Sequence, residues 1–207
     1  MNDISFQASR GEIIAIAGAN GAGKSTLARM LCGLQKSGSG TVLWAGKPMS
    51  RRLRRKKAYM VMQDVGHQLF TDSVAAECAL GIKAPNKDEI DRALEKVDLL
   101  AYKERHPLSL SGGQMQRLAV VVSDICGKEL LVFDEPTSGL DLKSMEEVGT
   151  LTRSLATQGK VLLIITHDIE FMMRICTRIL FIRDGEIVED LSGGQKEKIV
   201  RLLRGEE

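Results

Sequence analysis

A Gly-rich segment near the start of the chain carries the residue types that bind phosphate. The pattern G-x-x-x-x-G-K-[ST] is met by Gly18, Ala19, Asn20, Gly21, Ala22, Gly23, Lys24 and Ser25, and Thr26 is next. Glycines let backbone N–H groups converge on an anion, and the following helix adds the positive end of its dipole. Lys24 can reach the β- and γ-phosphates of a nucleotide, and the Ser25 hydroxyl can ligate Mg²⁺. We predict a nucleotide phosphate site here.

Two adjacent carboxylates supply the second half of that chemistry. The apolar run Leu130–Phe133 ends in Asp134 and Glu135. An Asp at the end of a buried strand is held rigidly and can anchor the Mg²⁺ shell. Glu135 points differently and can polarise a water for attack on the γ-phosphate. The alternative is that both acids are solvated turn residues, and together with Lys24 the pair favours ATP or GTP hydrolysis.

These residues need parallel strands and helices to position them. Apolar runs typical of buried parallel strands are Ile13–Ala17, Leu130–Phe133 and Val161–Ile165. Shorter strands are expected at Thr41–Trp44 and Tyr59–Met62, with a hairpin of Arg178–Ile182 and Glu186–Val188. Helical spacing is found in Asn86–Tyr102, Gln114–Cys126 and Lys143–Gln158. In the first of these, Ile90, Leu94, Val97 and Ala101 share one face. The alternation of strands and helices predicts an α/β fold with a largely parallel sheet.

Composition limits the class of protein. The 207 residues are 43% hydrophobic and 27% charged, which is globular composition, with a formal net charge of +2. That charge gives no global field for nucleic acid. No apolar run exceeds five residues, so no bilayer span is expected. The four cysteines, Cys32, Cys78, Cys126 and Cys176, lie far apart and are expected to be buried and reduced, not zinc ligands.

A pentapeptide 20 residues before Asp134 narrows the family. Its residues are Leu110, Ser111, Gly112, Gly113 and Gln114. The sequence and position resemble the signature of ATP-binding-cassette (ABC) ATPases. Gln63, Asp141 and His167 fall in order at places similar to the Q-loop, D-loop and switch-histidine loop of that family. The resemblance runs from Ile4 to about Glu189.

The resemblance implies a fold and a domain organisation. The fold is an α/β P-loop NTPase of the RecA-like type, with a mostly parallel sheet, a small antiparallel part and an inserted helical subdomain. The single domain 1–207 would comprise a core of 1–64 and 127–190, a helical subdomain of about 65–126 and a short C-terminal helix at 193–204.

The resemblance also implies roles for individual residues. ATP and Mg²⁺ are expected, with Ser25, Gln63 and Asp134 as metal ligands. Lys24, Gln63, Glu135 and His167 would form the catalytic set. The signature residues would contact ATP held by a second ABC ATPase subunit, in a homo- or heterodimer bridged through Asp141.

The segment Gln63–Phe70, with Thr71–Val74 after it, resembles energy-coupling factor (ECF) transporter ATPases, which drive uptake of vitamins or transition-metal ions. This implies docking of an integral membrane subunit near residues 63–80, at the cytoplasmic face of the membrane, with no nucleic acid partner. Packing of the helical subdomain is the alternative for Leu69, Phe70 and Val74. The alternative function is a soluble ABC ATPase in complex assembly, for example of iron–sulphur clusters.

Three features depart from the family pattern or lie outside it. The first edge strand and the aromatic that stacks on adenine are missing, and the position of Phe6 favours a core role. A second LSGGQ, Leu191–Gln195, is expected to be a turn into the final helix. The basic run Arg51–Lys57 is expected to be a solvated face, with contact to anionic lipid or a membrane partner as the alternative.

Overall fold

A six-stranded sheet forms the centre of the computed structural model, which describes residues 4–192 and 195–204. The strand order is β4-β5-β6-β1-β7-β8, and all neighbours are parallel except the antiparallel pair β7 and β8. The strands are β1 (Ile13–Ala17), β4 (Ala58–Val61), β5 (Leu130–Asp134), β6 (Val161–Ile165), β7 (Arg178–Arg183) and β8 (Glu186–Ser192). A separate two-stranded sheet pairs β2 (Leu43–Trp44) with β3 (Lys47–Pro48). The predicted α/β fold with a mostly parallel sheet is confirmed.

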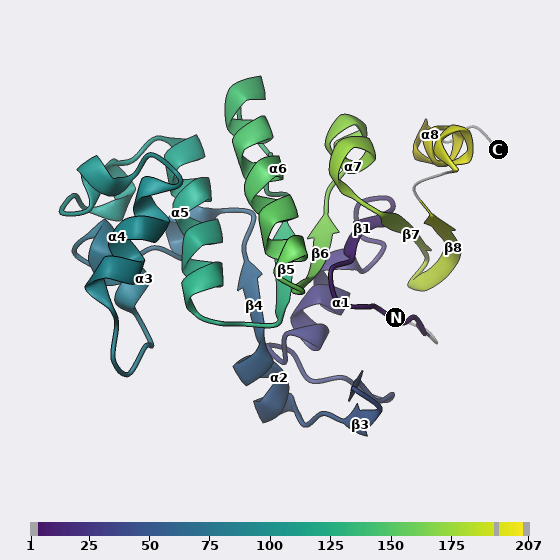
Figure 1. Ribbon diagram of the computed structural model, residues 1–207. Coiled ribbons are helices and arrows are strands. Elements are labelled where there is room, and N and C mark those ends of the chain that lie inside the picture. The colour runs from purple at the N-terminus through teal and green to yellow at the C-terminus, as the bar shows by residue number, and fades with distance from the viewer. Residues whose placement is uncertain (1–3, 193–194, 205–207) are drawn as a thin grey trace.

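Helices cover both faces of this sheet. Helices α6 (Leu142–Thr157) and α7 (Ile169–Ile175) lie on one face, and α1 (Lys24–Leu31) lies on the other, with α2 (Arg51–Lys57) beyond it (Figure 1). Helix α8 (Lys196–Arg204) lies beside β8 at one edge (Figure 1).

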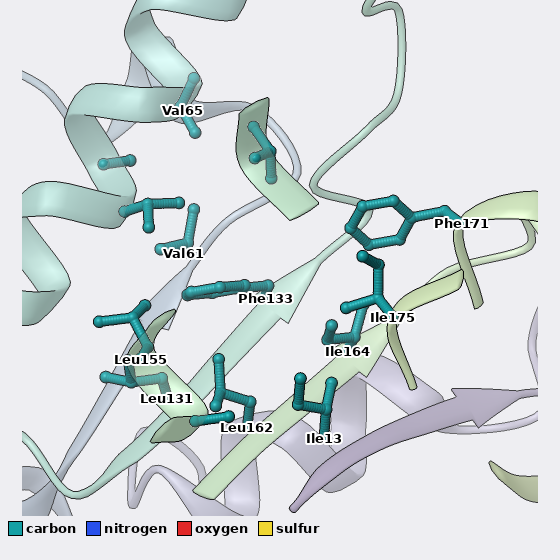
Figure 2. Packing of buried hydrophobic residues seen from close by; sticks show 14 residues of the cluster. Ile13, Val61, Val65, Leu131, Phe133, Leu155, Leu162, Ile164, Phe171 and Ile175 are labelled. Atoms are coloured by element: carbon teal, nitrogen blue, oxygen red, sulfur yellow. The ribbon is translucent and has the colours of Figure 1, made fainter. Parts of the chain in front are cut away.

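Strands β1, β5 and β6 are almost entirely apolar because each contributes side chains to cores on both faces of the sheet. Alternate residues of neighbouring strands, such as Ile13, Leu131 and Phe133, face α5, α6 and α7. Figure 2 shows this cluster, with Phe171 and Ile175 of α7 against the sheet. The intervening residues, including Ile14 and Val132, pack against α1, and Phe6 joins that second cluster as the sequence predicts.

The helical insertion builds a core of its own at the β4 edge. It contains α3 (Val74–Ala79), α4 (Lys87–Glu95) and α5 (Gly112–Ile125), with 3₁₀ segments η1 (Val65–His67), η2 (Leu100–Tyr102) and η3 (Pro107–Ser109). These helices cluster together on the side of β4 in Figure 1. Leu69, Val74 and Leu118 are buried within the cluster, whereas Phe70 is 69% exposed.

Two predicted elements are shorter than expected. The helix predicted over Asn86–Tyr102 ends at Glu95, because Asp98 takes a left-handed conformation with φ of 56°. Val97 is still buried, but Ala101 is exposed and lies within the separate 3₁₀ segment η2. The strand predicted over Thr41–Trp44 begins only at Leu43.

The remaining sequence expectations have mixed outcomes. Cys32 and Cys78 are buried, and burial raises the pKa of each thiol to about 12. Cys126 and Cys176 are only partly buried, which differs from the expectation. In the second LSGGQ, Leu191 and Ser192 end β8, the two glycines lie outside the described residues, and α8 starts at Lys196.

The basic run has a structural role that its charge alone does not reveal. Arg51 donates to the Gly33 and Leu34 carbonyls, and buried Arg54 donates to Met30 O at 2.7 Å. Both therefore bind carbonyls at the end of α1, where a helix favours cations. Within the described part of the chain, no helix is both long enough and apolar enough to cross a bilayer.

Candidate functional site

The predicted site residues follow the carboxyl ends of neighbouring parallel strands. Strand β6 lies between β1 and β5, so the loop after β1 and the acids after β5 flank the end of β6. In open α/β sheets, ligands bind at the carboxyl edge. His167 follows β6, and Gln63 follows β4 next to β5. One edge of the sheet therefore collects four segments that lie far apart in the sequence.

The phosphate-binding loop is held tightly against the sheet at its first glycine. Gly18 has φ of 142°, and a Cβ there would lie 2.1 Å from the Ile182 carbonyl oxygen of β7. Only glycine fits this combination of conformation and contact. Lys24 is the first residue of α1, and its Nζ donates to Gly18 O at 2.8 Å and Ala19 O at 2.9 Å. The ammonium is thus folded over the loop at a helix N-terminus, where anions bind.

Asp134 is buried at the end of β5 beside the loop. Burial raises the pKa of its carboxyl, while a hydrogen bond from Ser25 lowers it and the charge of Glu135 raises it further. The charges of Arg29 and Lys24 lower the same pKa. The structure therefore brings the proposed Mg²⁺ ligands Ser25 and Asp134 together.

Glu135 and His167 form a pair across two strand ends. His167 Nδ1 lies 2.8 Å from Glu135 Oε1. The Glu135 N–H donates to Ile165 O at 2.8 Å, which extends the β5–β6 pairing by one residue. Glu135 also has φ of 50°, a strained conformation for an L-residue with a long side chain. The imidazole is largely exposed and the carboxylate is not, so the pair projects from the sheet edge toward solvent.

The signature and the proposed D-loop meet through two helix N-termini. Ser111 caps α5, where its Oγ accepts from the Gln114 N–H at 3.3 Å and Gln114 Oε1 accepts from the Ser111 N–H at 2.9 Å. Asp141 caps α6 by accepting from the Ser144 N–H at 2.7 Å, and this bond lowers the pKa of Asp141. A Cβ on Gly113 would lie 2.5 Å from Ser144 Oγ. Helix α5 lies on the β4 side of the molecule, away from α1 (Figure 1).

Several contacts around the site were not found from the sequence. Arg117 of α5 forms an ion pair with Glu147 of α6 and donates to Val97 O at 3.2 Å. The Gln68 side chain bonds the end of β4 just before Gln63, which is itself exposed. Such contacts join residues far apart in the chain or on a loop without periodicity, so no local pattern marked them.

The chemistry of these donors fits Mg²⁺ bound together with phosphates. Ser25 and Asp134 offer hard oxygen ligands, as Mg²⁺ prefers. Over the described residues, no group of three or more His, Cys, Asp or Glu side chains forms a metal cage. Mg²⁺ is usually held by one or two carboxylates plus substrate phosphates, which agrees with this sparse donor set.

Comparison with known proteins identifies the family of this chain. The family model described as ABC transporter matches residues 1–138. The chain belongs to the ABC transporter family. A curated Streptomyces avermitilis protein named as an ABC transporter ATP-binding protein is 37% identical over 93% of this chain and 76% of its own length.

Other relatives of this ABC protein are longer. A Treponema denticola protein named as an ABC transporter ATP-binding protein is 58% identical over 98% of this chain, and a second is 48% identical over 87%. The matches cover only 42% and 37% of those two proteins. Among solved structures, cbiO1 from Clostridium perfringens, part of the ABC transporter complex cbiONQ, has a TM-score of 0.83 and 30% identity over 98% of this chain and 85% of its own. A bacterial Atm1-family ABC exporter with ATP bound has a TM-score of 0.79 and 27% identity, over 99% of this chain and 37% of its own.

Proposed function

We propose that the chain is the ATP-hydrolysing subunit of an ABC transporter. The observation that carries this proposal is the convergence of the Lys24 loop, Asp134, Glu135 and His167 at the ends of three adjacent strands. Each group has the chemistry that phosphoryl transfer to water requires: a cationic cradle, a metal anchor, a base and a hydrogen-bonding partner. The family membership supports the same reading.

In this proposal each residue has a defined task. Lys24 and the N–H groups of its loop bind the β- and γ-phosphates. Ser25, Asp134 and Gln63 would hold Mg²⁺, which when bound neutralises phosphate charge. The Glu135 carboxylate accepts a proton from the attacking water, and His167 holds the γ-phosphate and orients that water. Ser111 and Gly113 would reach the ATP of a second ABC ATPase subunit, identical or related, in a head-to-tail dimer.

The test of the hydrolytic role is Glu135→Gln. We expect steady-state ATP hydrolysis to fall by about 10² or more, the usual loss on removing a positioned base, while ATP affinity stays near wild type. Exposed Glu95 lies on α4, and Glu95→Gln serves as the matched control. Wild-type turnover in Glu135→Gln would refute the base assignment. A Lys24→Ala variant is expected to lose ATP affinity itself, measured by nucleotide titration.

We further propose that the subunit binds an integral membrane protein at the cytoplasmic face of the membrane, as an ECF-type importer of a vitamin or a transition-metal ion. The segment Gln63–Phe70 supports this, as does 30% identity to cbiO1, a component of a transporter complex. The exposed Phe70 lies within residues 63–80, the proposed docking region, with exposed Leu80 at its end. These apolar side chains are available to a membrane subunit.

Affinity isolation from detergent-solubilised membranes tests the partner. A stoichiometric polytopic membrane protein would support the transporter. Recovery only in the soluble fraction with soluble partners would favour the alternative, an ABC ATPase in complex assembly such as iron–sulphur cluster formation. Phe70→Asp should abolish the membrane partner's recovery, whereas Leu43→Asp, at another exposed apolar residue, should not.

A further inference from the structure

The Gln68 side chain is bonded to the last residues of β4. Its Oε1 accepts from the Met62 N–H at 3.0 Å, and its Nε2 donates to Met60 O at 2.8 Å. A third bond runs from Nε2 to the Tyr59 hydroxyl at 3.1 Å. One carboxamide therefore satisfies a backbone carbonyl within β4 and the backbone N–H of the first residue after the strand.

This arrangement replaces a missing neighbour strand. Strand β4 pairs with β5 on one side and is the edge of the six-stranded sheet on the other. An edge strand leaves alternate N–H and C=O groups without partners. The groups of Met60 and Met62 that Gln68 binds are such a pair. The carboxamide thereby fixes the strand as far as the residue that precedes Gln63.

The chain between Met62 and Gln68 is restrained at several further points. Asp64 Oδ1 accepts from the Gly66 N–H at 3.1 Å, and the Gln68 N–H donates to Val65 O at 2.9 Å. The next residue, Leu69, is 2% exposed and belongs to the core of the helical insertion. Gln63 thus lies on a closed loop whose base is cross-linked by Gln68 and whose far end is anchored in α3–α5.

We propose that Gln68 is a positioning residue for Gln63. The carboxamide bridge sets where Gln63 leaves the sheet, and through Leu69 it makes that position depend on the helical insertion. Gln63 reaches a metal–phosphate group only when the loop base is closed. This inference rests on the proposed role of Gln63 as a Mg²⁺ ligand.

Amide exchange and nucleotide binding test the proposal on the full chain. In Gln68→Ala, hydrogen exchange at the Met62 amide should accelerate at least about tenfold because its acceptor is gone. Affinity for ATP with Mg²⁺ should fall about tenfold, the lower range for loss of a group that orients a metal ligand. Affinity for ATP in EDTA should stay unchanged. Gln63→Ala should give the same loss with Mg²⁺ but normal exchange at Met62.

Two further variants separate positioning from general stability. Tyr59→Phe removes the third bond and keeps both backbone bonds, so its affinity for ATP with Mg²⁺ should stay within about twofold of wild type. Adding Gln68→Ala to Gln63→Ala should weaken binding no further, because both act through one ligand. Gln158→Ala, on the exposed end of α6, controls for loss of a Gln elsewhere.

The outcomes separate the two proposals. If Gln68→Ala exchanges faster at Met62 but binds ATP with Mg²⁺ like wild type, while Gln63→Ala is weakened, Gln68 only stabilises the strand and the positioning role is overturned. If Gln63→Ala itself binds normally, the metal-ligand assignment fails and the positioning role fails with it. The hydrolytic function is then judged separately by Glu135→Gln.

Discussion

The close approach of α5 and α6 at Gly113 predicts a sharp difference between two adjacent glycines. A Cβ on Gly113 would meet Ser144 Oγ at 2.5 Å and Ser144 Cβ at 2.9 Å, whereas a Cβ on Gly112 would meet nothing within 4 Å. Rotation of the Ser144 side chain can move Oγ but not Cβ. Gly113→Ala therefore requires the two helix N-termini to separate, and Gly112→Ala does not.

The expected magnitudes follow from two opposing terms. Replacing Gly by Ala in a helix stabilises by up to about 1 kcal/mol through backbone entropy, and this term is common to both variants. Overpacking costs about 1–3 kcal/mol and applies only to Gly113→Ala. We expect Gly112→Ala to be neutral or stabilising and Gly113→Ala to lie about 1–3 kcal/mol below it in free energy of unfolding.

Urea unfolding without nucleotide measures the difference, since bound nucleotide would itself stabilise the fold. A double-mutant cycle with Ser144→Gly, which removes both clashing atoms, should return a coupling energy of about 1 kcal/mol or more. Ser144→Ala keeps Cβ and should give a smaller coupling. Equal stability of the two glycine variants, or no rescue by Ser144→Gly, would refute the packing argument.

Three other perturbations have defined outcomes. Asp134→Asn should stabilise the nucleotide-free protein at pH 7, because burial raises the pKa of Asp134 above its ordinary value of 3.8 and its ionisation disfavours the folded state. The gain in free energy of unfolding should disappear below pH 3.8, where the carboxyl is protonated in both the folded and the unfolded state. Urea unfolding across pH 3–7 checks this. A gain that persists in acid would contradict it. Glu77→Ala should lower the free energy of unfolding by about 2–4 kcal/mol. The buried Glu77 carboxylate accepts from the Phe70 N–H and from both the N–H and the hydroxyl of Thr71, and these donors would lose their acceptor. A loss under about 0.5 kcal/mol in urea unfolding would show that these donors find other partners. Arg117→Met should lower thermal stability more than Lys143→Met, since Lys143 is exposed and Arg117 joins α5 to α6. Equal losses would mean that the partly buried ion pair contributes no more than an exposed one.

The sequence predicted best those features that depend on local pattern. Fully apolar runs identified β1, β5 and β6, because both faces of such a strand are buried and take apolar side chains. The loop from Gly18 to Ser25 stays a predicted phosphate site, and what the structure adds is its conformation, with positive φ at Gly18, Gly21 and Gly23. Long-range approaches, such as that of Gly18 to Ile182, explain such glycines but cannot be read from spacing.

Boundaries that depend on tertiary contacts were less predictable. Apolar spacing continues from Ile90 to Ala101, but the chain turns at Asp98 so that Leu99 can enter the same core from another direction. In the basic run, Arg51 and Arg54 were indistinguishable from their solvated neighbours, because the α1 carbonyls that they bind lie about 20 residues earlier. The contacts of Gln68 and Arg117 likewise exist only once the helical insertion has packed.

The order of strands in the sheet differs from the order in which a ribosome makes them. Strand β1 is synthesised first of the six but pairs only with β6 and β7, and Ile13 faces Leu162, 149 residues later. At a synthesis rate of roughly 5–20 residues per second, about 7–30 s pass between the synthesis of β1 and that of its neighbour β6. During that interval both edges of this apolar strand lack the neighbours with which they pair in the folded sheet. The centre of the sheet can therefore form only after most of the chain has been made.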